Sequence, residues 1–256
     1  MKKQCIECWG DYAYFGNSMY GAHRQSYEIP TPAAVVGIYE AIYWKPCIRW
    51  VPDEIQIMRP TKYVSIMRNE LRTLPCKWNE ATCGPYHVQA VRNRDAERIQ
   101  RCDRILKDVR YRFLAHLEYD SSKETEPGCS YIKHVEMFER RAKHGQCVHQ
   151  PYFGAKEYVA HYRWVDLDDP EEWLDPKDLA GCEPSQRGIM HYGWDWSGKK
   201  PIPLDFTPLV LGSRVWINAA TCQEHIEDNQ CTPYPVMRGV SKKNKKNKKN
   251  NKRSKK

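Results

Sequence analysis

The stretch VRYRFLAHLEY, residues 109–119, gives the clearest strand signal in the chain. Apolar and polar side chains alternate along most of it, which predicts a strand with one apolar face and one mainly polar face. The apolar face consists of Val109, Tyr111, Phe113, Ala115, Leu117 and Tyr119. This period of two makes residues 109–119 the anchor of the predicted fold.

A helix is predicted upstream of this strand, in the stretch TPAAVVGIYEAIYWKP (31–46). Thr31 suits the N-cap, Pro32 suits the first helical position, and the final proline ends the helix. The spacing places Tyr43 in the last turn. Gly37 lies inside the helix, where glycine costs about 1 kcal/mol relative to alanine. We therefore expect another part of the protein to pack closely against Gly37.

A second helix is predicted downstream of the strand. Ser130 suits its N-cap, the sequence YIKHVEMFERRAKH covers residues 131–144, and Gly145 closes it. Residues 88–107 are rich in charge and indicate either a solvated helix or a mobile basic arm, and the pattern does not separate the two. Further strands are predicted at residues 3–9, around Ile55 and Ile57, at 62–67, at 155–165 and in a hairpin over 208–218.

The order of these elements, with a helix between strands twice over, predicts an α+β fold. We expect a ferredoxin-like (RRM-like) domain over residues 1–155 and a C-terminal antiparallel β-sheet extension over residues 156–240. Residues 241–256 form a low-complexity basic tail that we expect to be disordered.

Composition limits the classes of function. The chain has 256 residues and a formal net charge of +9, and residues 242–256 hold nine lysines and one arginine without an acid. Subtracting those ten charges from +9 leaves −1, so a nucleic-acid site in the body must be a local patch. Eleven cysteines, an odd number with no apolar leader before them, lead us to expect reduced thiols and a cytoplasmic location. No apolar run reaches the length of a membrane span, so no membrane partner is predicted.

Lys133 and His134 lie in the first turn of the predicted second helix. Backbone N–H groups and the positive end of the helix dipole attract phosphate there, and imidazole changes its protonation near neutral pH. The pair therefore suggests a phosphodiester site, while an ordinary solvated helix start fits the same spacing. Tyr43 is likewise either a half-buried packing residue or a nucleotide contact.

Cys5 and Cys8 have the spacing of half a zinc site but point to opposite faces of a strand, so no metal or cofactor site is predicted.

Several motifs together resemble a known family. The most distinctive are EAIYWKPCIRW (40–50) and KHVEMFERRAKHGQCVHQPYFGAKEY (133–158). They occur in order with GDYAYF (10–15), SYEIPTPAAVVGI (26–38), RNE (68–70) and KDVRYRFLAHLEY (107–119). Over most of residues 1–165 these segments resemble the Cas-five proteins of CRISPR subtype I-C, a family of the RAMP superfamily.

The resemblance implies a RAMP-type ferredoxin-like domain and an enzyme that cleaves precursor CRISPR RNA within its repeats without a metal ion. It implies a catalytic trio of Tyr43, Lys133 and His134, because these residue types stand at the matching motif positions. It further implies a protein that keeps the 5′ handle of the mature guide RNA and joins an interference complex with Cas-seven and Cas-eight subunits. The alternative is a non-catalytic subunit that only binds this handle.

Cleavage of RNA through its own 2′-hydroxyl needs a base, a cation and an acid, but no metal ion. Lys133 suits the charge-stabilising task, and the division of acid and base roles between Tyr43 and His134 stays open. Contacts to RNA phosphates are predicted for Lys45, Arg68, Arg110, Arg140 and Arg141.

Overall fold

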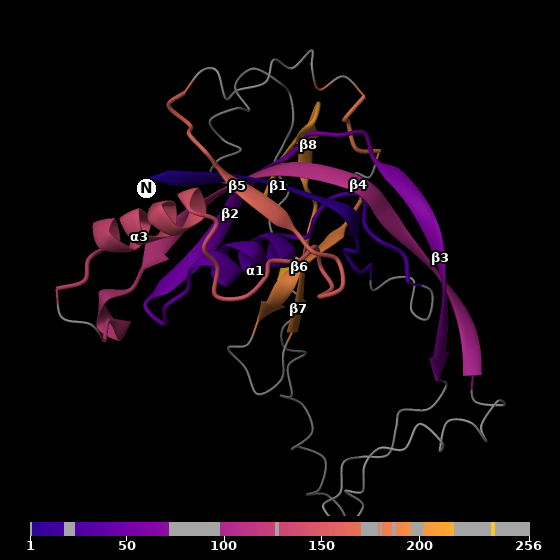
Figure 1. Ribbon diagram of the computed structural model, residues 1–256, viewed down its shortest axis with the longest axis horizontal. Coiled ribbons are helices and arrows are strands. Elements are labelled where there is room, and N and C mark those ends of the chain that lie inside the picture. Colours follow the sequence, from indigo (N-terminus) through magenta and orange to yellow (C-terminus); the bar gives the residue numbers. More distant parts are fainter. Residues whose placement is uncertain are drawn as a thin grey trace, which may run out of the picture.

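The computed structural model describes residues 2–17, 24–71, 98–125, 128–169, 179, 181–185, 188–195, 202–217 and 237–238. Within these ranges, two α-helices lie against one side of a large antiparallel sheet (Figure 1). The elements are β1 (Lys3–Ala13), α1 (Pro32–Ile42), β2 (Ile48–Ile57), β3 (Lys62–Leu71), β4 (Arg98–Tyr119), η4 (Ser121–Lys123), α3 (Tyr131–Lys143), β5 (His161–Val165), β6 (Met190–Asp195), β7 (Ile202–Phe206), β8 (Leu209–Leu211), β9 (Arg214–Trp216) and β10 (Met237–Arg238). Among the described residues, no helix has the length and hydropathy to cross a membrane.

In the described residues, the main sheet has seven strands. Six follow the order β5-β1-β4-β2-β9-β8, and β3 pairs with the N-terminal part of β4. Each of these strand pairs is antiparallel. A second sheet has the order β10-β7-β6. Strands from both sides of residue 155 share the main sheet, and the predicted division at that residue stays a prediction. The predicted tail, residues 241–256, lies outside the described residues.

The main core lies between the helices and the sheet. The Trp50 ring on β2 packs against Tyr39 of α1 and Phe138 of α3, with centroid distances of 4.8 and 4.5 Å. The Tyr39 hydroxyl lies 2.9 Å from the carbonyl oxygen of Gln4 and 2.7 Å from that of Phe113. These contacts join both helices to the central strands. They also hold the C-terminal end of α1, where the candidate site begins.

Both predicted helices are confirmed, with Thr31 and Ser130 as their N-caps. The first ends at Ile42, so Tyr43 is its C-cap and does not lie in the last turn, as the spacing predicted. Tyr43 has an extended backbone with φ −153° and ψ 123°. The indole N–H of Trp50 donates to the Tyr43 carbonyl oxygen at 2.9 Å. This bond stabilises the extended backbone at Tyr43, so the helix does not continue through it.

Residues 98–107 form neither of the two predicted alternatives. β4 runs through them without interruption, and its residues 98–107 pair with the whole length of β3. Asp103 of β4 forms an ion pair with Arg68 of β3 at 3.1 Å, and the Arg104 guanidinium lies 4.3 Å from the centre of the Tyr63 ring. Pairing between the strands thus overrides the helical spacing of this segment, while residues 88–97 lie outside the described residues.

The predicted strand at residues 155–165 is shorter than expected, because only β5 at its C-terminal end joins the sheet. The hairpin predicted at residues 208–218 is confirmed by the pairing of β8 with β9. Cys5 packs with Leu114 and Val165 on one face of the sheet, whereas Cys8 belongs to the main core on the other. This arrangement confirms that the two cysteines point to opposite faces.

Gly37 has open space around it, although the sequence predicted a close neighbour. A Cβ atom at this exposed position would meet no atom within 4 Å outside its own helix. We therefore expect Gly37→Ala to raise the free energy of unfolding by about 0.5–1 kcal/mol, because alanine favours the helix without creating a clash. Denaturant-induced unfolding measures this change. A lower free energy of unfolding in the variant would show that the position is in contact after all.

Candidate active site

The phenol of Tyr43 and the imidazole of His134 meet between the two helices. Tyr43 Oη lies 2.8 Å from His134 Nδ1. Both side chains are buried, with exposed fractions of 4% and 2%. Tyr43 comes from the C-terminal end of α1 and His134 from the first turn of α3, so two helix ends join residues that stand 91 positions apart.

The second nitrogen of His134 faces a carboxylate. Nε2 lies 2.8 Å from Glu124 Oε2, and the same oxygen accepts from the Cys47 thiol at 3.2 Å and the Tyr119 hydroxyl at 3.4 Å. Because an ionised carboxylate only accepts hydrogen bonds, Nε2 carries a proton, and Nδ1 of a neutral imidazole then accepts from Tyr43. A continuous chain of hydrogen bonds therefore runs from the phenol through the imidazole to the carboxylate.

The end of α1 is held by hydrogen bonds from α3, from the segment after α3 and from β2. The carbonyl oxygen of Ala41 accepts from the Val148 N–H at 2.7 Å, and that of Ile42 accepts from the Arg141 guanidinium at 3.1 Å. With the Trp50 indole on the carbonyl of the C-cap, these bonds satisfy the last acceptors of the helix. The position of the phenol is thus set by the packing of α1 against α3 and β2.

Burial keeps the Tyr43 phenol and the Cys47 thiol protonated. Burial raises the pKa of Tyr43, and the positive charges of Lys45 and Arg141 offset only part of this effect. The Arg141 guanidinium lies 5.1 Å from the centre of the Tyr43 ring. Burial, and then the hydrogen bond to Glu124, raise the pKa of the Cys47 thiol. At neutral pH, Tyr43 and Cys47 are therefore hydrogen-bond donors.

Lys133 lies next to His134 in the sequence but on the exposed side of α3. Its backbone N–H lies 3.5 Å from the Ser130 hydroxyl oxygen, which caps the helix. Its side chain forms no ion pair or hydrogen bond with any residue that the structure describes. The structure thus brings two members of the predicted trio together and places the third on the outer surface of the same helical turn.

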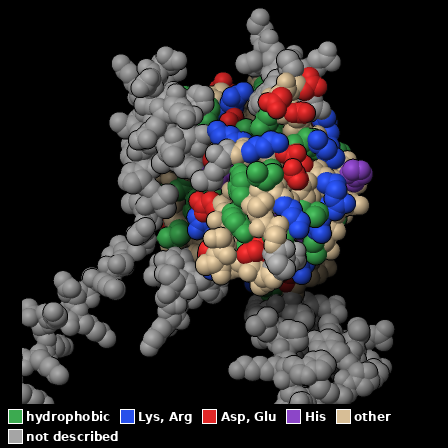
Figure 2. All heavy atoms as spheres, turned by 90° about the vertical axis from the view of Figure 1, so that its left-hand side faces the viewer, with side chains coloured by type: hydrophobic (Ala, Val, Ile, Leu, Met, Phe, Trp, Pro, Cys, Tyr) green, Lys and Arg blue, Asp and Glu red, His purple; other side chains and the backbone are tan. Residues whose placement is uncertain are grey.

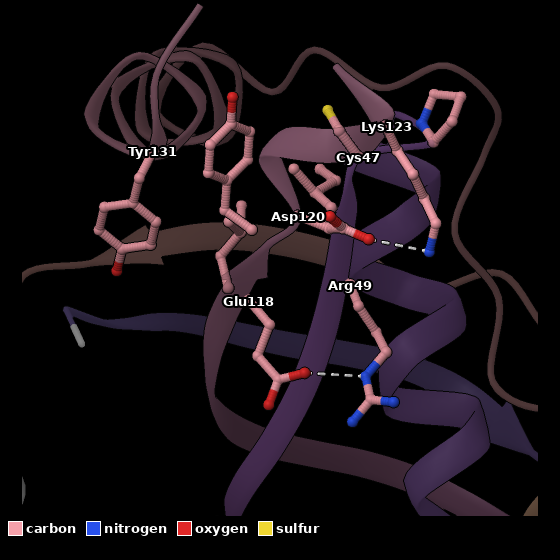
Figure 3. A pocket seen from close by; sticks show the side chains of 10 residues that line it. Cys47, Arg49, Glu118, Asp120, Lys123 and Tyr131 are labelled. Carbon is pink, nitrogen blue, oxygen red and sulfur yellow. Dashed lines mark ion pairs between the residues drawn. The ribbon is translucent and has the colours of Figure 1, made fainter.

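A pocket of about 710 Å³ adjoins the site (Figure 3). It is lined by Pro46, Cys47, Ile48, Arg49, Leu117, Glu118, Tyr119, Asp120, Lys123 and Tyr131. Two ion pairs lie along it, between Arg49 and Glu118 at 3.0 Å and between Lys123 and Asp120 at 3.1 Å. Cys47 and Tyr119 line the pocket and also contact Glu124, so the pocket lies next to the carboxylate end of the hydrogen-bond chain.

The predicted phosphate contacts lie at separate places on the molecule. Lys45 and Arg141 are near Tyr43, and Arg140 is exposed on α3. Arg68 lies on β3, where two carboxylates offset its charge. The side of the molecule shown in Figure 2 carries basic and acidic side chains interspersed, without a broad basic field. Of the five predicted contacts, Lys45 and Arg141 lie near Tyr43, and the binding of RNA by all five stays a prediction.

Arg110 lies on the sheet face that is opposite the helices. It donates to Glu7 at 2.6 Å, and Arg112 and Arg163 each donate to the same carboxylate at 3.0 Å. Burial alone would raise the pKa of Glu7, but the three guanidinium groups outweigh it and hold the pKa below its ordinary value. Arg110 thus belongs to a structural charge cluster, and its contact with RNA stays a prediction.

Two residues of the site were not predicted from the sequence. Cys47 belongs to the motif at residues 40–50, so that motif could have indicated it. Glu124 lies in a polar loop without any local signal. His134, which the sequence placed in the first turn of its helix, is buried, and Tyr43 and Glu124 lie against its two ring nitrogens.

With this geometry established, similarity to known proteins identifies the family. Residues 5–219 match the family model described as CRISPR-associated protein (Cas_Cas5). The chain therefore belongs to the Cas5 family of CRISPR-associated proteins.

Two relatives carry a more specific name. The chain is 38% identical over 170 residues to the CRISPR pre-crRNA endoribonuclease Cas5d of Mannheimia succiniciproducens, covering 64% of this chain and 73% of the relative. It is 33% identical over 174 residues to the protein of the same name from Thermus thermophilus, covering 68% of this chain and 69% of the relative. These matches confirm the resemblance to the Cas-five proteins of subtype I-C.

Solved structures share the fold. A crystal structure of a CRISPR-associated protein aligns with a TM-score of 0.58 at 18% identity, covering 85% of this chain and 92% of the other. A functionally uncharacterized protein from Streptococcus mutans aligns with a TM-score of 0.55 at 16% identity, with the same coverage of 85% and 92%. Both support a mixed α/β architecture built on a mainly antiparallel sheet.

Proposed function

We propose that this protein is a metal-independent endoribonuclease that cleaves precursor CRISPR RNA within its repeats. The observation that carries the proposal is the 2.8 Å contact between Tyr43 Oη and His134 Nδ1, backed by Glu124 on the other ring nitrogen. The names of the two relatives support the substrate class.

The proposed reaction uses the RNA's own 2′-oxygen as the nucleophile. A bond forms from this oxygen to the neighbouring phosphorus, and the bond from phosphorus to the 5′-oxygen breaks. A base takes the 2′-hydroxyl proton and an acid returns one to the leaving oxygen, so the products end in a 2′,3′-cyclic phosphate and a 5′-hydroxyl.

The site offers a candidate for each task. Tyr43 suits the acid, because burial raises its pKa and the phenol is protonated at neutral pH. His134 suits the base, because Glu124 holds the imidazole in the tautomer that accepts at Nδ1. Lys133 and the N-terminal end of α3 suit the stabilisation of the charge that develops on the phosphoryl oxygens.

A second candidate is a non-catalytic protein that only holds the 5′ handle of the guide RNA. One observation favours it: both nitrogens of His134 are engaged, and the side chain is 2% exposed. A nuclease needs Tyr43 or Glu124 to move when RNA binds, whereas a handle-binding protein needs no such movement.

Cleavage of the chain's own repeat RNA separates the two candidates. We expect cleavage to persist in EDTA and to stop when the scissile nucleotide carries a 2′-deoxy sugar, while both RNAs bind with similar affinity. End-group analysis should find the cyclic phosphate. Binding of the all-ribose repeat without cleavage would leave only the handle-binding role. Cleavage of the deoxy substrate would exclude attack by the 2′-hydroxyl, and loss of cleavage in EDTA would exclude the metal-free mechanism.

We further infer that the protein stays on the 5′ handle and assembles with the Cas-seven and Cas-eight subunits of a type I-C complex, an inference supported by its family.

We also assign the helix-covered part of the sheet to the ferredoxin-like (RRM-like) fold of RAMP proteins. The support is the strand order β5-β1-β4-β2, with α1 between β1 and β2 and α3 between β4 and β5.

A further inference from the structure

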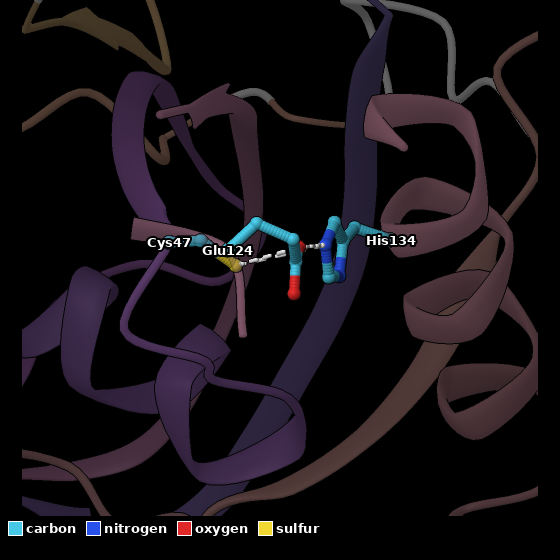
Figure 4. A group of neighbouring side chains, drawn as sticks. All are labelled: Cys47, Glu124 and His134. Atoms are coloured by element: carbon cyan, nitrogen blue, oxygen red, sulfur yellow. Dashed lines mark hydrogen bonds and ion pairs between the residues drawn. The ribbon is translucent and has the colours of Figure 1, made fainter. Parts of the chain in front are cut away.

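Three side chains at the carboxylate end of the hydrogen-bond chain form a compact triangle (Figure 4). Cys47 Sγ lies 3.2 Å from Glu124 Oε2 and 3.6 Å from His134 Nε2, and the last two atoms are 2.8 Å apart. Cys47 and His134 are buried and Glu124 is half-buried. All three atoms lie within 4.8 Å of one another, near enough to share one metal ion.

The triangle has nearly the size of one face of a zinc tetrahedron. Bonds of about 2.3 Å to sulfur, 2.0 Å to nitrogen and 2.1 Å to oxygen place neighbouring donor atoms about 3.4–3.6 Å apart. The sulfur and the nitrogen already have this separation, and the Glu124 oxygen needs to move outward by about half an ångström. Glu124 directly follows the short η4 segment, so this shift requires no movement of a helix or strand.

We propose that Cys47, Glu124 and His134 bind Zn²⁺ and that the bound ion blocks RNA cleavage. Binding of the ion releases the Cys47 thiol proton to solvent and leaves a thiolate ligand. A thiolate, an imidazole and a carboxylate are ligands that zinc prefers, whereas magnesium prefers oxygen ligands alone. The pocket of Figure 3 reaches Cys47, which gives the ion a route from solvent and supplies water as a fourth ligand.

The inhibitory half of the proposal rests on the proposed function. A metal ion binds an imidazole nitrogen through its lone pair, so zinc at Nε2 of His134 places the remaining ring proton on Nδ1. Nδ1 then donates to the Tyr43 oxygen and no longer accepts a proton. Glu124, as a zinc ligand, no longer holds the ring in its active tautomer. Zinc therefore removes the base from the site without displacing any helix.

Titration of the reduced full-length protein with Co²⁺ tests the binding half, because tetrahedral cobalt with a thiolate ligand absorbs in the visible and near-ultraviolet. We expect the wild-type chain to bind one more equivalent of Co²⁺ with this absorption than Cys47→Ser does. Zinc should displace this additional cobalt ion. Competition with a chromophoric chelator should show that Cys47→Ser lowers the zinc affinity of this site by more than about 100-fold. Cys102→Ser is the matched control, because Cys102 is an exposed cysteine on β4 outside the triangle.

The titration shows whether Cys47 is a ligand of the bound ion. Identical cobalt spectra for the wild-type chain and Cys47→Ser would overturn it, as would loss of the same equivalent in Cys102→Ser. Circular dichroism checks that Cys47→Ser is folded. If it is not, Glu124→Gln replaces it, because the variant keeps the size of the side chain but provides a much weaker ligand.

Single-turnover cleavage in the presence of zinc tests the inhibitory half. We expect the wild-type chain and Cys102→Ser to lose cleavage as the site fills and to regain it in EDTA, while the same concentration of Mg²⁺ has no effect. Cys47→Ser, compared with its own zinc-free rate, should need about 100-fold more zinc for the same loss. Zinc that fills the site without changing the wild-type rate would overturn inhibition. If the wild-type chain cuts no RNA in zinc-free buffer, the proposed function fails instead, and the cobalt spectra still decide the zinc site.

Discussion

Replacing His134 by alanine is expected to slow single-turnover cleavage of the cognate repeat RNA by about 10²–10⁴-fold, the usual contribution of a general acid or base. In this variant, Tyr43 loses the acceptor at 2.8 Å and Glu124 loses the donor that it faces. The affinity for the same RNA should change little, because the imidazole is only 2% exposed and presents almost no surface to a ligand. Quenched-flow kinetics and filter binding measure the two quantities separately.

His144→Ala is the matched control for this prediction. His144 is the C-cap at the far end of the same helix, and its Nδ1 lies 2.7 Å from the Arg140 carbonyl oxygen. This variant should keep the wild-type rate. Equal losses of rate and affinity in His134→Ala would mean that the residue only supports binding, and an unchanged rate would contradict the proposed relay. The same pair of measurements on Lys133→Ala tests the charge-stabilising role.

Alanine at Gly154 is expected to lower the free energy of unfolding by at least about 3 kcal/mol. Gly154 has a φ of +79°, and a Cβ atom would lie 1.9 Å from the Tyr14 carbonyl oxygen. The Tyr14 N–H donates to the Phe153 carbonyl oxygen at 3.1 Å, so the two segments cannot separate without breaking this bond. Thermal or denaturant-induced unfolding followed by circular dichroism measures the loss.

Gly145→Ala separates the steric contact from the backbone conformation. Gly145 follows the C-cap of α3 and has a φ of +65°, but a Cβ atom there would meet nothing within 4 Å. We expect this variant to lose only about 1–2 kcal/mol, the cost of the left-handed conformation for a residue with a side chain. Similar losses at the two positions would show that the Tyr14 carbonyl does not restrict residue 154.

Elements whose ends are set by neighbouring residues could be predicted from the sequence. Thr31 and Ser130 each cap a helix through hydrogen bonds that span only three or four residues, so the signal is local. The strand over residues 98–107 has no such signal. It is stabilised by partners on β3 such as Arg68, which forms an ion pair with Asp103. The sequence of the segment alone does not predict this pairing.

The candidate site shows the same limit more strongly. The spacing of residues left Tyr43 and His134 with ordinary structural explanations, and only the family resemblance joined them. Their contact depends on the whole core, which brings the end of α1 to the start of α3. Glu124 reaches them because the Asp120 N–H donates to the Cys47 carbonyl oxygen at 2.8 Å, a contact between loops that no periodic pattern encodes.

The bonds at the end of α1 make the two sides of the site unequal in stiffness. Neighbouring groups occupy the carbonyls of Ala41, Ile42 and Tyr43, so the phenol stands on a rigid support. The backbone of residues 120–125 contacts the body through the Asp120 N–H, which donates to the Cys47 carbonyl oxygen. Residues 120–125 can therefore shift more easily than the end of α1 that carries the phenol. In the proposed nuclease, we expect Tyr43 to be the group that stays fixed while the scissile bond is aligned.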